Sequence, residues 1–535
     1  MEALVQVTTR EVNELEIHND STSPLNPMEG DGLSLLAKLK LNMANGSDLT
    51  LTIDNQETDA KYELLNEIGT SYFPQAEEVT ESIGDDNSTR ERVTISYNFG
   101  SGNALFDSGE VRLFSQTTDQ KQVTDKTKAL IAFGPFGPSF IPTLEHKDYG
   151  FNQDLEGFAI DLYKQLNIGS TTHDLVYGFE SEEASYSRPK DRYETNLTTG
   201  EINRVFFGPE IFPNKAFPDS EVVREAFYLS DRVSLSESTT FVFGLRHDNY
   251  EQKAIEDSLS AAGNPANHPL LPREDSETSL KLGVIQDLSD TVSVFAQVAE
   301  GYRNPDFTDA YNTYTNYAFG YTIIPNPDLK AEYSTGYELG LRGTKLDVKW
   351  SLVLYKNNFK DFIDSNLYSS PPVNGILQVR YQNLESVRTK GVEFEIKRNI
   401  SETLSSFAGF ALNEADNLSN DAITPDQLKY GLSHISRSGD VSTNYVMTYM
   451  ADSPRLPPIV GRSGSTPAVF APRSITHDVF VDLDLNENFD LRLGIRNITD
   501  EKYWDWVSVA GLAQGTAQQY LNPGTNLSLD LRYTF

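Results

Sequence analysis

The residue types that most often carry metal or acid–base chemistry are thinly spread in this sequence. Its histidines occur at positions 18, 146, 173, 247, 268, 434 and 477, and no two of them have the spacing of ligands to one metal ion. Metal sites in proteins are built from several histidine, cysteine or carboxylate ligands, commonly at short and regular spacings. We therefore expect no preformed metal site.

Catalytic motifs are equally scarce. The chain has no cysteine, which removes disulfides, thiolate metal sites and cysteine nucleophiles together. It has no GxSxG, Walker loop, HExxH or glycine-rich dinucleotide turn. Glu393 and Glu395 form a carboxylate pair, but they share one face of an expected strand with other polar residues. Glycosidase chemistry would require a carboxylate separation and pKa values that a sequence does not supply. These observations predict a protein that is not an enzyme and has no intrinsic cofactor.

Two histidines lie in polar, loop-like sequence. His146 is in LEHKDYG and His268 is in NPANHPL. Each is a candidate to meet a ligand that arrives from outside, and each is equally explained as a solvated loop histidine.

The elements that must position all of these residues are β-strands, because apolar and other residues alternate along the chain. Near the C-terminus Leu527, Leu529 and Leu531 alternate with Ser528 and Asp530. A period of two places one set of side chains on an apolar face and the other in water. No stretch shows a sustained 3.6-residue stripe, so we predict an all-β protein. Similar runs occur at Leu35–Leu41, Val93–Phe99, Phe241–His247, Leu280–Gln286, Tyr337–Arg342, Leu346–Leu354 and Val392–Ile396.

Two features favour a membrane barrel over a soluble sandwich or propeller, which would alternate in the same way. The connection 485–491 contains the tight turn NENFD, whereas the preceding link, 416–475, is long and polar. Short turns at one rim and long loops at the other are typical of outer-membrane barrels. Aromatic residues also gather near strand ends, where an interfacial girdle would lie, as at Tyr503, Trp504 and Trp506.

The composition agrees with a barrel. Hydrophobic residues make up 38% of the 535 residues, and no apolar run approaches the roughly 18 residues that a spanning helix needs. Barrel strands need no such run, because only alternate residues face lipid. Lys and Arg total 44 against 78 Asp and Glu, and the resulting net charge of −34 disfavours nucleic acid as a partner. A solvated acidic surface and acidic loops at a cell surface both explain this charge.

The two ends of the sequence carry further signals. The first residues, MEALVQVTTREVNELEIHND, show no basic region followed by an apolar core, so they are not a signal peptide. Because export to an outer membrane needs such a signal, we expect the gene product to extend upstream. The final strand ends in LRYTF, and the aromatic Phe535 resembles the terminal signal that outer-membrane assembly machinery reads.

One segment in the middle of the chain resembles a known family. EGYRNPDF, at 300–307, is similar to the first of the paired boxes of TonB-dependent receptors, in particular those of the haem and haemoprotein branch. That box is usually Phe-Arg-Ala-Pro. Arg303 and Pro305 match it, whereas Tyr302 replaces the Phe and Asn304 replaces the Ala.

A second box and several other stretches follow in the expected order. NPDL resembles the family's Asn-Pro-Asn-Leu box and supplies Asn326, Pro327 and Leu329. Thr525 stands where the family commonly has Arg. The other similar stretches are HDLVYGFE at 173–180, FPNKAFPDSE at 212–221, GLRHDNYE at 244–251, YELGLR at 337–342, RNITDEKYWDW at 496–506 and the closing strand at 522–535. The resemblance covers nearly the whole chain.

This resemblance implies a large antiparallel transmembrane β-barrel of the 22-stranded receptor type. The first residues resemble roughly the third barrel strand, so about 20 strands are expected within residues 1–535. The N-terminal plug, the signal peptide and the segment that touches the TonB complex are expected outside this chain. The resemblance further implies a monomer in the outer membrane of a Gram-negative bacterium, surrounded by outer-membrane lipid. Arg303 and Arg342 are expected on inward faces, paired with lumen carboxylates such as Glu338.

The loop between the two boxes often carries, in the family, a histidine that ligates haem iron. The corresponding segment, 308–325, has none, which argues against axial histidine ligation here. A tyrosinate can bind ferric haem iron, and aromatic rings can stack on a porphyrin. The loop tyrosines therefore either bind haem or pack within the loop and contact protein; they are Tyr311, Tyr314, Tyr317 and Tyr321.

The resemblance implies TonB-dependent uptake of haem, or of haem taken from haemoproteins, with haem as a transported ligand. The absent loop histidine keeps open a receptor for siderophore-iron or another nutrient. A surface binding protein or adhesin that does not transport is an alternative from another class, and an outer-membrane enzyme is a more remote one.

Overall fold

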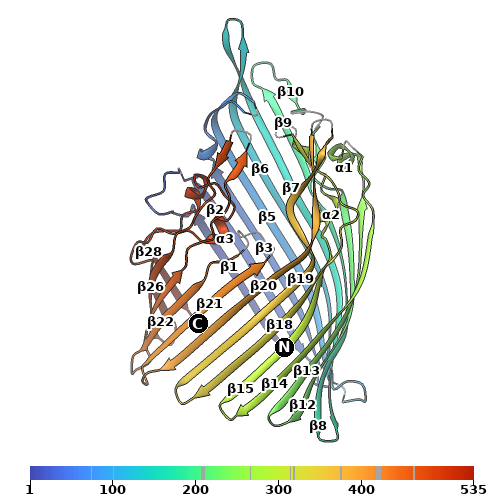
Figure 1. The fold of residues 1–535 in the computed structure, drawn as a ribbon, viewed down its shortest axis with the longest axis vertical. Helices are drawn as coiled ribbons and strands as arrows, with labels where there is room; N and C mark the ends of the chain where they lie inside the picture. Colours follow the sequence, from blue (N-terminus) through green and yellow to red (C-terminus); the bar gives the residue numbers. More distant parts are fainter. Residues whose placement is uncertain are drawn as a thin grey trace.

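The computed structural model describes residues 1–23, 25–73, 75–100, 102–206, 211–264, 267–313, 315–316, 320–373, 376–416, 423–461 and 464–534. These residues form one 26-stranded sheet, which curls into a tall barrel (Figure 1). Six of the strands are short pieces at the upper rim or upper wall, and the remaining twenty form the wall. This agrees with the predicted all-β barrel of about 20 strands.

The wall strands follow one another in chain order and pair antiparallel. They are β1 (Glu2–Asn13), β2 (Met28–Asn42), β3 (Asp48–Glu63), β5 (Glu77–Gly100), β6 (Ser108–Gly134), β7 (Gly137–Ile168), β8 (Thr171–Ser187), β12 (Asp219–Ser236), β13 (Thr239–Ile255), β14 (Arg273–Ser289), β15 (Val292–Arg303), β18 (Glu332–Lys345), β19 (Val348–Val373), β20 (Ile376–Asn399), β21 (Leu404–Asp416), β22 (Gln427–Ile435), β23 (Val441–Met450), β26 (Ser474–Asn486), β27 (Phe489–Arg496) and β28 (Asn526–Tyr533).

The remaining elements are short. The strands are β4 (Gly69–Ser71), β9 (Pro189–Asn196), β10 (Ile202–Asn203), β11 (Asn214–Lys215), β16 (Thr315–Asn316), β17 (Tyr321–Ile323) and a separate pair, β24 (Ile459–Gly461) with β25 (Gly464–Thr466). The helices are α1 (Ser258–Gly263), α2 (Phe307–Tyr311), α3 (Trp506–Val509), η1 (Leu65–Glu67) and η3 (Thr516–Tyr520). None of the described helices has the length and apolar character required to cross a membrane.

Strand register separates two faces of the wall. Phe243 lies opposite Leu282, and Leu282 lies opposite Val298, so the three side chains form one row across β13, β14 and β15. They are 47%, 52% and 37% exposed. In the alternate phase, Arg246 lies opposite Ser279. Only lipid makes an exposed apolar row favourable, so this row faces outward and the alternate residues face the barrel interior.

Connection lengths alternate between the two rims, as the sequence predicted. Two-residue turns at 169–170, 237–238, 290–291, 346–347 and 487–488 lie at the lower rim in Figure 1. The long connections 188–218, 304–331 and 497–525 lie at the other rim, which is therefore the extracellular one.

Three sequence expectations need correction. The link 416–475 is not one loop, because it contains β22 and β23. Leu346 lies in the turn before β19, with a φ of 51°, rather than in a strand. Trp504 and Trp506 do not form an interfacial girdle. They are 8% and 1% exposed and pack with Val509 in a small core within the connection 497–525. A buried loop core and a lipid interface both select large aromatic residues, so the sequence alone did not separate them.

The hairpin of β6 and β7 rises well above the extracellular rim (Figure 1). A buried ion-pair network crosses its root. The Lys128 Nζ lies 2.8 Å from Glu77 Oε2, 2.6 Å from Glu145 Oε2 and 2.7 Å from Glu194 Oε1. The Lys128 side chain is 2% exposed. The carboxylates of Glu145 and Glu194 raise the pKa of Lys128 against the opposing effect of burial. Lys147, Lys128 and Arg192 hold the pKa of Glu145 at about 2, although burial alone would raise it.

This network predicts that Lys128→Ala destabilises the root of the hairpin and leaves the membrane-spanning wall intact. The substitution leaves buried carboxylates without their cation, which costs about 3–5 kcal/mol. Hydrogen exchange should therefore accelerate in the upper parts of β6, β7 and β9. The control is Lys121→Ala, since Lys121 pairs with Asp148 at the surface, with side chains 57% and 34% exposed. Its expected effect is below about 1 kcal/mol. Equal protection in both variants would contradict the proposed role of the network.

Candidate functional site

The long extracellular connection 304–331 is fixed at its two ends by one carboxylate. Arg303, at the end of β15, donates from Nε to Glu332 Oε2 at 2.6 Å. The other oxygen of Glu332 accepts the backbone N–H of Ile363 in β19 at 2.5 Å. Glu332 is 8% exposed, so its charge depends on these partners. Arg303 thus pairs with an inward carboxylate, as expected, and that carboxylate is Glu332 rather than Glu338.

The second box fixes the connection where it returns to the wall. The Asn326 side chain is buried and donates to the backbone carbonyl of Tyr381 at 2.8 Å. Its oxygen accepts the N–H of Asp328 at 3.2 Å, which closes a tight turn. Leu329 is 2% exposed, and its carbonyl accepts from Arg273 Nη2 at 2.5 Å. Of the matched box residues, Pro305 is buried and Pro327 is exposed.

Sequence reasoning missed one residue of this arrangement. The Asn383 side chain, in β20, accepts from the N–H of Lys330 at 2.9 Å and donates to the carbonyl of Lys330 at 2.9 Å. It also donates to the carbonyl of Asp361 at 2.6 Å. The Asn383 side chain therefore gives the Lys330 backbone the hydrogen bonds that a neighbouring strand would otherwise supply. No local motif marks this residue, because its partner lies 53 positions away.

A short helix closes the start of the same connection. In α2, the Asp306 side chain caps the helix by accepting the N–H of Asp309 at 2.8 Å. Phe307 stacks on Tyr186 with ring centroids 4.4 Å apart and lies 4.8 Å from Phe217. Tyr311 is 2% exposed. This part of the loop is thus a small core set on the barrel rim.

The predicted loop tyrosines have different positions. The Tyr311 hydroxyl donates to the carbonyl of Leu271 at 3.0 Å, and burial raises its pKa to about 12. The Tyr311 hydroxyl is therefore protonated at neutral pH and hydrogen-bonded within the loop core. Tyr321 lies in β17, half-buried, beside β20. Tyr314 and Tyr317 lie outside the described residues, as does Phe535.

Of the two histidines expected in loops, His268 lies in one, whereas His146 lies within β7, so the expectation was wrong for His146. His146 lies on the β6–β7 hairpin, with Nδ1 2.7 Å from Asp125 Oδ1 and its ring 5.0 Å from that of Tyr193. His268 lies in the connection 256–272, where burial lowers its pKa. A neutral imidazole at neutral pH is the form that can ligate a metal. Among the residues that the structure describes, no cluster of three or more potential ligands forms a metal site.

Below the fixed connection, the inner wall contains a hollow of about 830 Å³. It extends across β5–β8 and β12–β15. Six basic residues and five acidic residues line it. Two of the acidic residues, Glu225 and Glu300, are in the opposite alternation phase from Arg224 and Arg303 and so belong to the outer face. The basic residues are Arg92, Arg112, Arg224, Arg246, Lys281 and Arg303.

Three of these cations, Arg92, Arg224 and Lys281, form no ion pair with a described carboxylate, and Arg92 instead donates to the Gln116 side chain at 3.4 Å. Arg246 contacts Glu180 and Asp248, and it forms an ion pair with each. By contrast, neither Arg224 nor Lys281 has a described carboxylate within 4 Å. The Arg224 guanidinium lies 5.6 Å from the ring centroid of Tyr250. The hollow therefore combines free positive charge with tyrosine rings, which suits a flat, aromatic anion.

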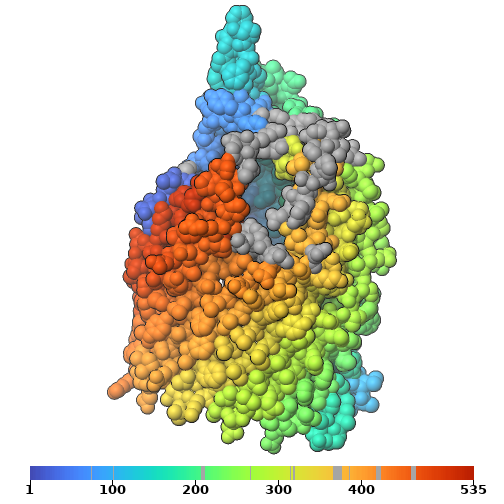
Figure 2. Space-filling view, viewed as in Figure 1, coloured from blue at the N-terminus to red at the C-terminus, as the bar shows by residue number. Residues whose placement is uncertain are grey.

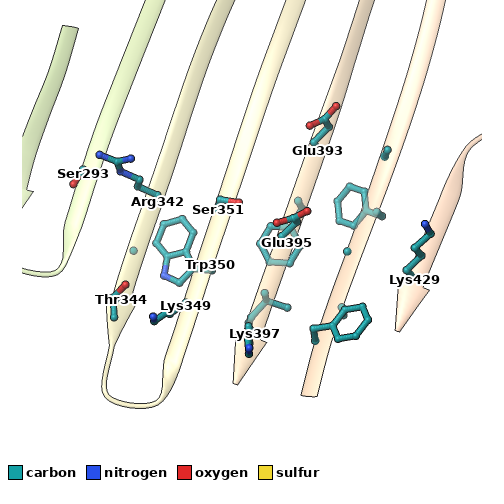
Figure 3. Close-up of a pocket in the computed structure, with 18 of the residues that line it drawn as sticks. Ser293, Arg342, Thr344, Lys349, Trp350, Ser351, Glu393, Glu395, Lys397 and Lys429 are labelled. Carbon is teal, nitrogen blue, oxygen red and sulfur yellow. The ribbon is translucent and has the colours of Figure 1, made fainter. Parts of the chain in front are cut away.

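A second hollow, of about 720 Å³, lies nearer the lower rim (Figure 3). Glu393 and Glu395 point from β20 to the same side, which confirms that this pair shares a strand face. Arg342, Lys349 and Lys397 lie around them. Arg342 forms no ion pair with any described carboxylate. The full lining has four basic residues, Lys429 included, and three acidic ones, Asp290 included. Its excess of positive charge is therefore smaller than that of the upper hollow, where six basic residues face three inward acidic ones.

Comparison with known proteins places this geometry in context. The model of the family described as TonB dependent receptor-like, beta-barrel matches residues 38–498. The "Hemoglobin-haptoglobin utilization protein B" of Neisseria meningitidis is 21% identical over 95% of this chain and 68% of its own length. The "Hemoglobin and hemoglobin-haptoglobin-binding protein A" of Haemophilus influenzae is 23% identical over 62% of this chain and 32% of its own length. This chain therefore spans about one third to two thirds of these relatives.

Solved structures share the fold over the whole chain at low identity. The "Copper transporter OprC" has a TM-score of 0.70 and 14% identity, covering 100% of this chain and 76% of its own. The Serratia marcescens haemophore receptor HasR, solved with its haemophore HasA and haem, has a TM-score of 0.68 and 12% identity, with the same coverage. At such identities the likeness shows the barrel fold alone.

Removing the shared carboxylate should release the long connection at both ends. Glu332→Ala leaves the Ile363 N–H and the Arg303 guanidinium without their acceptor, which costs about 1–3 kcal/mol locally. We expect limited proteolysis to cut within 304–331 at least several-fold faster. Asp328→Ala is the control, because its exposed side chain forms no described ion pair. Resistance of Glu332→Ala to cleavage, at the level of the unmodified chain, would contradict this role.

The same connection should be held less tightly as pH rises. Burial and the neighbouring Asp306 raise the pKa of Asp309 to about 6 from 3.8, although Arg303 Nη1 lies 3.4 Å away. Because the pKa of Asp309 is higher in the folded state than in the unfolded chain, its protonation stabilises the fold. This stabilisation is fully present below the unfolded pKa and is lost as pH rises through about 6. Hydrogen exchange in α2, corrected for intrinsic rates, should therefore show about tenfold less protection at pH 7 than at pH 4. Asp309→Asn should remove this dependence, and an unchanged profile would contradict the assignment.

Proposed function

Because the chain belongs to the TonB dependent receptor-like β-barrel family, we propose that it takes up haem, free or released from haemoproteins, across the outer membrane. Receptor barrels of this family are Gram-negative outer-membrane proteins. The observation that carries the proposal is the hollow of about 830 Å³ with free cations and tyrosine rings on the inner wall. Ferric haem is a flat aromatic molecule with two carboxylates, and this lining suits both properties.

The relatives support the same ligand class. Two curated proteins that align with much of this chain are named for haemoglobin and haemoglobin–haptoglobin. The solved structures do not choose between ligands, because the proteins in them are named for copper and siderophores as well as haem. The ligand preference therefore rests on the hollow and on the curated relatives, not on the barrel fold.

In this proposal haem enters through the extracellular rim, where the connection 304–331 is fixed by Glu332, Asn326 and Asn383. It then meets the cations of the inner wall, with Arg224 and Lys281 available to its carboxylates. Tyr321 and His268 are the candidates for an iron ligand among the described loop residues. Energy comes from the TonB complex. The plug and the TonB-contacting segment that the sequence led us to expect outside this chain remain a prediction, as do the monomeric state and the lack of enzymatic activity.

Neutralising two of the three unpaired cations should weaken haem binding through its carboxylates. For Arg224→Gln with Lys281→Gln we expect about tenfold weaker binding of ferric haem, since a factor of ten corresponds to about 1.4 kcal/mol. Haem dimethyl ester, which lacks the two negative charges, should bind both proteins equally. Binding is measured from the Soret band of the purified protein. Lys253→Gln is the control, because Lys253 is 57% exposed and pairs only with Glu251 among described residues. An equal loss for haem and its ester would contradict the electrostatic role.

A further inference from the structure

The tip of the β6–β7 hairpin is an apolar finger, defined here as residues 129–144. No residue in the segment ALIAFGPFGPSFIPTL carries a charge, although the chain has a net charge of −34. At the tip, Phe133 is 70% exposed, Phe136 104% and Phe140 54%. Figure 2 shows the finger standing clear of the rest of the molecule. Large exposed apolar surfaces of this kind on folded proteins usually mark an interaction site.

The finger presents its rings in a fixed geometry. Its strands pair without interruption from Lys128 opposite Thr143 to Gly134 opposite Gly137. Ile131 lies opposite Phe140, and Phe133 lies two residues further along, so all three side chains share one face. Phe136 occupies the two-residue turn beyond them. The charged residues that flank the segment, Lys128 and Glu145, are partners in the buried network at its root. The tip is thus apolar, while its base is held by ion pairs.

The position of the finger restricts its partner. It points away from the short-turn rim and beyond the end of the barrel (Figure 1), so the membrane that the barrel spans lies on the wrong side to receive it. A second copy in the same membrane would carry its own finger parallel to this one, and the two tips would not meet end to end. The partner therefore approaches from outside the cell.

The charge pattern indicates the chemistry of that partner. An acidic protein repels other acidic proteins at long range. A projection without charge places the contact at a distance from the acidic surface of the barrel. Rigid phenylalanine rings contribute most when they fill an apolar pocket and exclude water. Resting on the proposed function, we propose that the finger inserts into an apolar surface cleft of a folded haem-carrying protein and docks it above the barrel. The finger is then the docking site for the haem carrier, separate from the inner-wall hollow that receives haem itself.

The test compares two probes, haemoglobin and free ferric haem, on cells that display the full chain. The finger variant is Phe133→Ser, Phe136→Ser and Phe140→Ser. The matched control removes the same kind of side chain from the same rim with Tyr72→Ser, Leu271→Ser and Val507→Ser, which are 71%, 53% and 73% exposed. We expect the finger variant to bind haemoglobin at least tenfold more weakly, to bind ferric haem within twofold of the unmodified protein, and the control to bind both normally.

Several outcomes would overturn the proposal. One is unchanged haemoglobin affinity in the finger variant, and another is an equal loss in the control. An unmodified protein that binds ferric haem but not haemoglobin would overturn docking and leave the proposed function standing, whereas failure to bind either probe would remove both. Should the triple variant not reach the membrane, Phe136→Ser alone decides the matter. Its ring is fully exposed, so the substitution costs no packing. We expect about threefold weaker haemoglobin binding, whereas unchanged binding would show that the finger has no role.

Discussion

The backbone of this protein has to satisfy its hydrogen bonds within the sheet, because lipid offers neither donors nor acceptors. That requirement forces long antiparallel strands, and the strands in turn force the alternation of side chains between two environments. Leu282 in β14 faces lipid because Lys281 faces the interior, and neither assignment can change without the other. The charge on the inner wall is a consequence of this coupling. Arg224 and Lys281 project inward from strands whose other residues are chosen for lipid.

Above the membrane the constraint is different, since loop backbone has no neighbouring strand to pair with. The structure meets it with side chains that act as hydrogen-bonding partners for the backbone. Asn383 bonds both backbone groups of Lys330, and Asn326 reaches the carbonyl of Tyr381. The buried Glu332 joins the end of β15 to β19 through Arg303 and the Ile363 N–H. The motif residues shared with the family thus hold the shape of the extracellular connection, and the proposed ligand contacts come from residues outside the motifs.

The wall was predictable from sequence, whereas the partners at the rim were not. Runs such as Val93–Phe99 and Phe241–His247 fall within β5 and β13, because a period of two is encoded locally. The boxes drew attention to Arg303 and Asn326, but the partners of these residues lie 29 and 55 positions away and depend on strand register. Tyr311 illustrates the limit most clearly. A tyrosine in a loop is compatible with iron ligation or with packing, and only the fold shows its hydroxyl engaged with the Leu271 carbonyl.

We propose that haem binds within the hollow on the inner wall, below the fixed extracellular connection. The most direct test is a crystal structure of the protein with ferric haem, with anomalous scattering recorded at the iron edge. We expect a single iron peak within the hollow, with the haem carboxylates toward Arg224 and Lys281 and the porphyrin beside Tyr228 or Tyr250. An iron peak confined to the outer surface or to the lower hollow around Glu393 and Glu395 would contradict it.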